Sequence, residues 1–282
     1  MAAVTAARAE ARAAMMRRAN KAAEIIPPRA YDFERHLAYE AQPTAPRTDA
    51  TTPKDALARA LDACPPDQEP VVLYACGSLL PIHLEHVANL ERAKAHAERR
   101  GFRVVGGYVA TSNDLYVRRK YAEQKRLRDF LPHAARRELI GLALEDHGWL
   151  RLDAWDGEPQ KRFVEFWAAQ ASLAAHLDAW CDATGRRRVA VVGVHGSDLA
   201  NKCRIVDMFR RLRLRCCIVE RPNAPLERPP DGDSDCWVLP GGLSRNLSST
   251  DAQRLLREGR GLDGVLHPNV ARRFRELLGE GG

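Results

Sequence analysis

The chain has 282 residues, of which 45% are hydrophobic and 6% aromatic. This composition is typical of a soluble globular protein and not of a disordered one, and no run approaches the roughly 20 apolar residues of a membrane-spanning helix. A formal net charge of +7 and an isoelectric point near 9.2 favour an anionic ligand. Nucleic acid, an anionic membrane surface and phosphorylated small molecules all fit that sign.

The first 68 residues are predicted to form an arm and a linker. Residues 1–24 are rich in Ala and Arg and predict a helix without a clear apolar face, and the prolines within residues 26–53 indicate a surface linker. An Arg-rich start is also typical of transit peptides, so mitochondrial or plastid targeting stays open beside a cytoplasmic or nuclear location. The basic arm at residues 1–35 offers a contact for nucleic acid or protein. We favour a solvated helix or a subunit contact, and with it a homo-oligomer.

Seven cysteines are scattered along the chain, in odd number and without a C-x-x-C pair. No hydrophobic secretory segment precedes them, so we expect reduced thiols in a reducing compartment. Their spacing does not predict a protein-bound zinc site.

From residue 53 onward, short apolar runs alternate with segments of helical periodicity. Strands are predicted at residues 71–75, 102–109, 150–154, 188–194, 214–220 and 236–239. Helices are predicted at residues 53–64, 83–100, 136–146, 161–183, 252–258 and 269–278. This alternation predicts an α/β fold: a Rossmann-like open parallel sheet with helices on both faces, formed by residues 69–282 behind an N-terminal helical and extended arm. Ligands of such sheets bind beyond the carboxyl ends of the strands.

The segment after the first predicted strand carries two histidines at the start of a helix. Gly77 permits a tight turn, and Pro81 fixes the backbone ahead of the helix. His83 and His86 then stand one turn apart on the same side. Backbone N–H groups at a helix start attract phosphate, and imidazoles donate hydrogen bonds to it, so the pattern predicts a polyphosphate site. Two unrelated surface or metal-binding histidines are the alternative interpretation.

The sequence GSLLPIHLEH at residues 77–86 resembles the H/T-x-x-H signature of the nucleotidyltransferase superfamily. More narrowly, the chain is similar to eukaryotic-type nicotinamide/nicotinate mononucleotide adenylyltransferases. The motifs that carry this resemblance occur in the family's order: VVLYACGS at 71–78, GGY at 106–108, DLY at 114–116, WLRLDAW at 149–155, HGSDL at 195–199, IVER at 218–221 and NLSST at 246–250.

The resemblance implies a reaction in which the phosphate of a pyridine mononucleotide attacks the α-phosphorus of ATP and releases pyrophosphate, with Mg²⁺ bound to the ATP phosphates. It implies catalytic roles for His83, His86 and Arg118, the last in place of a family lysine. It also implies that Trp149 stacks on the pyridine ring and that Asp198 binds ribose or a magnesium-bound water. The other substrate-binding residues that it implies are Gly77, Ser78, Arg136, Gly196, Arg221, Asn246, Ser248, Ser249, Thr250 and Arg254.

Several of these residues also have a purely structural interpretation. Trp149, like the nearby Trp155, fits a core aromatic, and Asp198 fits a helix cap. Residues 248–250 form a good helix start without any ligand. Arg118 lies in a basic stretch at residues 118–128, where most charges are expected on a solvated face.

The family pattern breaks at three places that concern the site. Leu80 replaces a polar residue, Gln253 stands where the motif S-S-T-x-x-R has its arginine, and the chain is shorter than the family between Asp198 and Arg221. Arg254 is one residue further on, about 100° round a helix. A nucleotidyltransferase of the same fold with another phosphate acceptor, and a non-catalytic nucleotide-binding or scaffold protein, therefore stay open.

Overall fold

The computed structural model describes residues 44–157, 162–227, 230, 232, 235–239 and 247–279. Most of the predicted N-terminal arm, and the predicted ligand residue Asn246, lie outside these residues. Within them, no helix is both long enough and apolar enough to cross a membrane.

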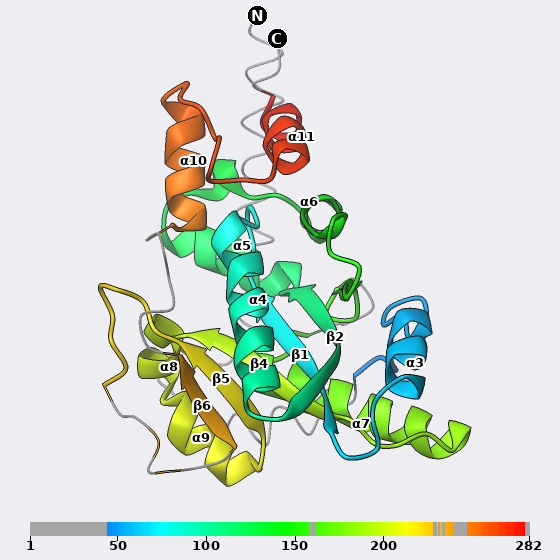
Figure 1. Cartoon of the computed structure of the whole chain (residues 1–282). Helices are drawn as coiled ribbons and strands as arrows, with labels where there is room; N and C mark the ends of the chain where they lie inside the picture. Colours follow the sequence, from blue (N-terminus) through cyan, green and yellow to red (C-terminus); the bar gives the residue numbers. More distant parts are fainter. Residues whose placement is uncertain are drawn as a thin grey trace, which may run out of the picture.

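Six parallel strands form one sheet in the order β3-β2-β1-β4-β5-β6, which confirms the predicted Rossmann-like fold (Figure 1). The central strand is nearly free of polar side chains and has no exposed face at Val71–Tyr74, as expected for a strand covered on both sides. The strand bounds are β1 Glu69–Gly77, β2 Phe102–Thr111, β3 Leu150–Asp153, β4 Ala190–Gly196, β5 Arg215–Val219 and β6 Cys236–Leu239.

Helices cover both faces of the sheet and give it separate cores. One core packs α4, α6, α10 and α11 against the sheet, with α4 lying in front of it in Figure 1, and a second packs α3 and α7 on the other face. A third cluster joins α8 and α9 to β5. The helix bounds are α3 Asp55–Asp62, α4 Leu84–Arg99, α5 Asp114–Glu123, α6 His133–Leu144, α7 Phe166–Thr184, α8 Ser197–Cys203, α9 Ile205–Leu212, α10 Ser249–Arg257 and α11 Pro268–Leu278, with the short 3-10 helix η1 at Leu127–Asp129.

The predicted long helix at residues 161–183 begins later than expected, at Phe166, and ends as expected at Gly185, whose φ is +66°. Helices α5, α8 and α9 were not predicted. Their apolar faces are short, and α5 lies in the basic stretch that we interpreted as a solvated surface.

The described part of the predicted linker is integrated into the domain. The guanidinium of Arg47 forms a buried ion pair with Asp153 at 2.8 Å and lies over the ring of Trp155, 4.2 Å from its centroid. Trp155 in turn donates from Nε1 to the Ala45 carbonyl. Residues 44–68 supply α3 and this buried contact to the sheet.

Candidate functional site

A cavity of about 460 Å³ opens beyond the carboxyl ends of β1, β2 and β4. The strand order reverses between β1 and β4, the place where open parallel sheets bind their ligands. Seven of the predicted site residues line this cavity: Gly77, Ser78, His86, Gly196, Asp198, Arg221 and Ser249. Seven others do not: His83, Arg118, Arg136, Trp149, Ser248, Thr250 and Arg254.

The turn after β1 is held by hydrogen bonds from the end of β2. The hydroxyl of Thr111 donates to the Ser78 carbonyl at 3.0 Å, and the backbone N–H of Ser112 donates to the Gly77 carbonyl at 2.9 Å. The guanidinium of Arg136 donates to the Ser112 carbonyl at 2.8 Å and pairs with Asp114 at 2.7 Å. Arg136 is fully buried and ties the end of β2 to the start of α5. It does not line the cavity, as a phosphate-binding residue would.

His83 and His86 form a stacked pair at the start of α4, with ring centroids 3.6 Å apart. His83 caps the helix, and its backbone N–H donates to Nδ1 of His86 at 3.1 Å. Burial lowers the pKa of His83 to about 3 and that of His86 well below its usual range, helped by the positive charge of Arg221. Both rings are therefore neutral at pH 7, and His86 presents its ring to the cavity as a neutral hydrogen-bonding group.

Lys120 of α5 carries a positive charge into the cavity and was not among the predicted site residues. Its ammonium donates to the Ser78 hydroxyl at 3.1 Å, and Arg119 beside it also lines the cavity. Arg118, the predicted residue, lies instead over the ring of Phe130, 4.8 Å from its centroid. Neighbouring positions on a helix differ by about 100°, so the choice among these three residues depends on the helix phase, which the basic stretch alone does not reveal.

The loop after β4 brings a second group of charges to the cavity. Asp198 pairs with Arg221 across 3.0 Å, and Lys202 lies one turn further along α8. A Cβ at Gly196 would lie 2.6 Å from the Asp198 carboxylate, so a larger residue here would displace that carboxylate. Gly196, Asp198 and Arg221 thus lie together on the cavity wall, and the Asp198 carboxylate is half-exposed.

Helix α10 contributes one residue, Ser249, to the described cavity wall. Its hydroxyl donates to the Pro81 carbonyl at 2.9 Å. Ser248 caps the helix instead, because its hydroxyl accepts from the Asp251 backbone N–H at 3.1 Å, and Thr250 accepts from Arg126. The contacts of Ser248 are therefore those of a helix cap, whereas Ser249 lies on the cavity wall, where it could contact a ligand.

The two main departures from the family pattern contact each other. The buried amide of Gln253 donates to the Leu80 carbonyl at 2.9 Å and to the Tyr121 hydroxyl at 3.0 Å, and its oxygen accepts from Arg126. Gln253 thus joins α10 to the turn after β1 and does not reach the cavity. Arg254 points to Glu258 at 3.1 Å on the exposed side, so it does not replace the missing arginine.

Neither nearby tryptophan lines the cavity. Trp149 directly precedes β3, at the amino end of the strand, and its Nε1 donates to Glu91 of α4 at 2.9 Å. A Cβ at Gly107 would lie 2.7 Å from the Trp149 ring, so the glycine makes room for that indole against β2. Trp155 follows β3 but is buried beneath Arg47. The stacking role expected of Trp149 therefore has no geometric support.

An aromatic wall lines the cavity where an indole was expected, formed by Tyr116, Phe163 and Phe166. The rings of Tyr116 and Phe163 stack with centroids 4.8 Å apart. Phe166 contacts the edge of His195, a further lining residue whose pKa is lowered by burial to about 4. This wall offers flat apolar surfaces beside the charged residues of α5 and α8.

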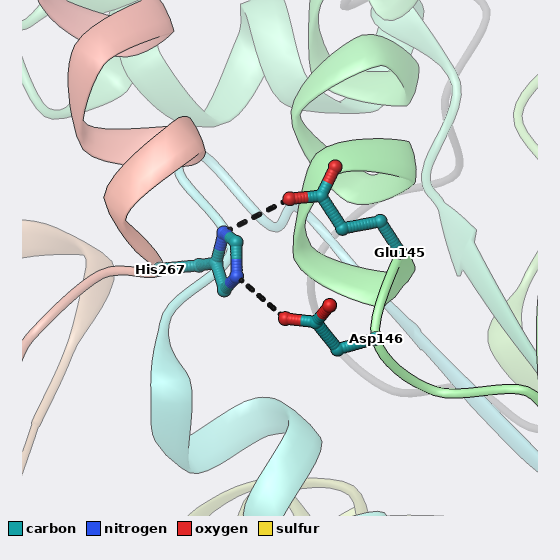
Figure 2. Close-up of side chains that lie close together, drawn as sticks. All are labelled: Glu145, Asp146 and His267. Atoms are coloured by element: carbon teal, nitrogen blue, oxygen red, sulfur yellow. Dashed lines mark hydrogen bonds and ion pairs between the residues drawn. The ribbon is translucent and has the colours of Figure 1, made fainter.

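One group of side chains in the described residues could hold a metal ion outside the cavity: Glu145, Asp146 and His267 (Figure 2). Figure 2 shows the imidazole between the two carboxylates, with Nε2 of His267 3.1 Å from Asp146 and Nδ1 3.8 Å from Glu145. The contact joins the end of α6 to the start of α11. None of the three residues lines the cavity, so this group is a tertiary contact and not part of the candidate site.

No protein-family model matches the chain. Its sequence relatives include nicotinamide/nicotinic acid mononucleotide adenylyltransferase 2 of Xenopus tropicalis, 27% identical over 210 residues that cover 72% of this chain and 53% of that protein. Adenylyltransferase 1 of the same description from Saccharomyces cerevisiae is 34% identical over 93 residues, 32% of this chain and 21% of that protein. The chain thus spans about half the length of the Xenopus relative that it matches.

Solved structures give a looser likeness. The Plasmodium falciparum nicotinic acid mononucleotide adenylyltransferase complexed with APC aligns over 74% of this chain and 96% of that one, with 14% identity and a TM-score of 0.49. A putative nicotinate-nucleotide adenylyltransferase from Vibrio parahaemolyticus gives 14% identity, 72% and 98% coverage and a TM-score of 0.37. The sequence relatives confirm, at low identity, the resemblance drawn from the motifs.

Proposed function

We propose that this chain, a divergent relative of the nicotinamide/nicotinic acid mononucleotide adenylyltransferases, transfers the adenylyl group of ATP to a pyridine mononucleotide. The observation that carries the proposal is the position of the cavity. It lies at the strand-order reversal, against the start of α4, and collects Ser78, His86, Ser249 and the cations of α5 and α8. A helix start with several cations around it suits a polyphosphate.

The chemistry requires alignment and charge neutralisation more than covalent participation by the protein. A phosphate oxygen of the mononucleotide forms a bond to the α-phosphorus of ATP, and the bond from that phosphorus to its bridging oxygen breaks as pyrophosphate leaves. His86, neutral at pH 7, is suited to donate a hydrogen bond to a phosphate oxygen. The ammonium of Lys120 and the hydroxyl of Ser78 lie together beside it and are suited to hold the reacting phosphates.

Magnesium is expected to arrive on ATP and not in a cage made by the protein. Mg²⁺ usually binds substrate phosphates, waters and one or two carboxylates, and the described cavity offers the half-exposed carboxylate of Asp198 for this purpose. Bound there, the ion would neutralise charge on the leaving pyrophosphate. Asp198 would hold its coordinated waters while Arg221 fixes the carboxylate.

The acceptor ring is proposed to lie against the aromatic wall of Tyr116, Phe163 and Phe166. The oxidised pyridine ring of the mononucleotide is cationic, and aromatic faces attract flat cations. Tyr116 stands on α5, four residues before Lys120, so a ring at the wall leaves the acceptor phosphate near the cations of that helix. The same wall would accept other flat bases, which keeps a different phosphate acceptor as the second candidate.

The test is to incubate the purified chain with ATP, Mg²⁺ and nicotinamide or nicotinate mononucleotide, and to measure dinucleotide and pyrophosphate. We expect both products in equal amounts. His86→Ala should abolish turnover, whereas His96→Ala on the same helix, outside the cavity, should not. Pyrophosphate release with another acceptor only would support the second candidate. ATP binding without any product would contradict the proposal and favour a non-catalytic nucleotide-binding role.

A further inference from the structure

Two lysines reach the cavity from either side of the central strand without a carboxylate partner in the described chain. Lys120 stands on α5, after β2, and Lys202 on α8, after β4, and β2 and β4 are the two neighbours of β1. We infer that Lys120 and Lys202 bind the triphosphate of ATP together, and that they supply the positive charge that the chain lacks at Gln253. This inference deepens the proposed function and rests on it.

The other cations of the cavity are already neutralised within the protein. Arg119 pairs with Glu123 at 2.9 Å, and Arg221 pairs with Asp198 at 3.0 Å. The ammonium of Lys120 has only the uncharged Ser78 hydroxyl, at 3.1 Å. Lys120 is partly buried, where an unpaired charge is costly, so this lysine gains most from a bound anion. Lys202 is exposed and adds a second positive charge to the same cavity wall.

The two lysines also repel each other. The pKa of Lys120 is lowered, first by burial and next by the positive charge of Lys202, with Arg126 adding to the effect and Asp198 opposing it. A ligand with several negative charges removes this repulsion, whereas one with a single phosphate removes less of it. The arrangement therefore discriminates by the length of the phosphate chain.

The arginines near α10 are engaged elsewhere. Arg126 donates to Thr250 and Gln253 and pairs with Asp129 at 3.1 Å, and Arg254 pairs with Glu258 outside the cavity. Ser249 is the one residue of α10 that lines the cavity, and it is uncharged. Among the described residues, the positive charge left for the phosphates therefore comes from α5 and α8.

Calorimetric titration with ATP, AMP and inorganic tripolyphosphate tests this inference on the full chain. Lys120→Gln and Lys202→Gln should each weaken ATP and tripolyphosphate binding by roughly 10- to 100-fold, the loss of one charge-assisted contact, and change AMP binding little. Lys202→Arg should keep most of the affinity. Lys94→Gln, on α4 beside Trp149 and outside the cavity, is the matched control and should bind as the unmodified chain does.

Two outcomes would overturn the inference: ATP affinity unchanged in both glutamine variants, or AMP affinity reduced as much as ATP affinity. Far-ultraviolet circular dichroism of each variant checks that the fold is kept. Calorimetry measures ATP binding without turnover, so its result does not depend on whether the chain makes dinucleotide. The inference about the lysines and the proposed function can therefore be contradicted independently. A chain that makes no dinucleotide but binds ATP through these lysines contradicts only the proposed function. An active enzyme whose ATP affinity ignores both lysines contradicts only this inference.

Discussion

The buried ion pair between Arg47 and Asp153 allows a sharp test of whether residues 44–68 are part of the folded domain. The Arg47 guanidinium donates to both carboxylate oxygens at 2.9 and 2.8 Å, to the Ala169 carbonyl at 3.0 Å and to the Ser172 hydroxyl at 3.1 Å. Both side chains of the pair are almost without solvent exposure. Arg47→Met removes the cation and keeps most of the volume, so the Asp153 carboxylate stays buried without its counter-ion.

Breaking a buried ion pair by removing one partner typically costs about 3–5 kcal/mol of folding free energy. For a domain of this size, that loss lowers the melting temperature by about 6–20 °C. Urea titration followed by circular dichroism measures the loss. Adding Asp153→Asn to Arg47→Met should recover part of it, because the second change removes the unpaired charge.

Arg186→Met is the matched control, since it breaks an exposed pair with Asp62. Such pairs contribute little, so the urea midpoint should not move measurably. If Arg47→Met proved as mild as Arg186→Met, the segment before β1 would not be docked as described, and the domain would begin near residue 69 after all.

Three further predictions concern the contacts of α10, acid stability and the acceptor side. Gln253→Ala should cost about 1–3 kcal/mol by leaving the groups it binds unpaired, whereas Arg254→Ala should change the urea midpoint little. Burial lowers the pKa of His133 and His195 from 6.5 to about 4, so the unfolded chain binds protons that the folded chain does not. Stability should therefore be full above pH 6.5 and fall as the pH drops toward 4; a flat urea midpoint over this range would refute the assignment. Phe163→Leu should raise the KM for the mononucleotide about 2- to 10-fold and leave the KM for ATP unchanged, which steady-state kinetics would check.

The sheet could be predicted from the sequence because its strands are nearly continuous apolar runs. The run predicted at residues 71–75 is the buried centre of β1, and the predicted strand at residues 236–239 matches β6. Helix α5 carries buried apolar residues at Val117 and Tyr121 only, within a charged stretch. Its one clear local signal is Asn113, whose side chain accepts from the Leu115 backbone N–H and caps the helix.

The candidate site was predictable on its β1 and β4 sides, where motif residues directly follow buried strands. Motif order does not reveal that Trp149 lies outside the cavity, because the position of this residue depends on the direction of β3. A residue just before a parallel strand lies at the amino end, opposite the edge where ligands bind. Arg136 and Gln253 could not be classified from sequence, because whether such a side chain meets a ligand or a backbone carbonyl depends on packing between distant segments.

The contacts of α10 with the turn after β1 have a consequence for biosynthesis. The Ser249 hydroxyl and the Gln253 amide bind the carbonyls of Pro81 and Leu80, across 168 and 173 residues of chain. All six strands have been synthesised by Leu239, so a nascent chain can assemble its sheet before α10 leaves the ribosome. The turn at which ATP is proposed to bind is then completed after the strands. A truncation after residue 240 would remove α10 and α11 from the core on one face of the sheet and would leave the turn on which ATP is proposed to rest without its two contacts from α10.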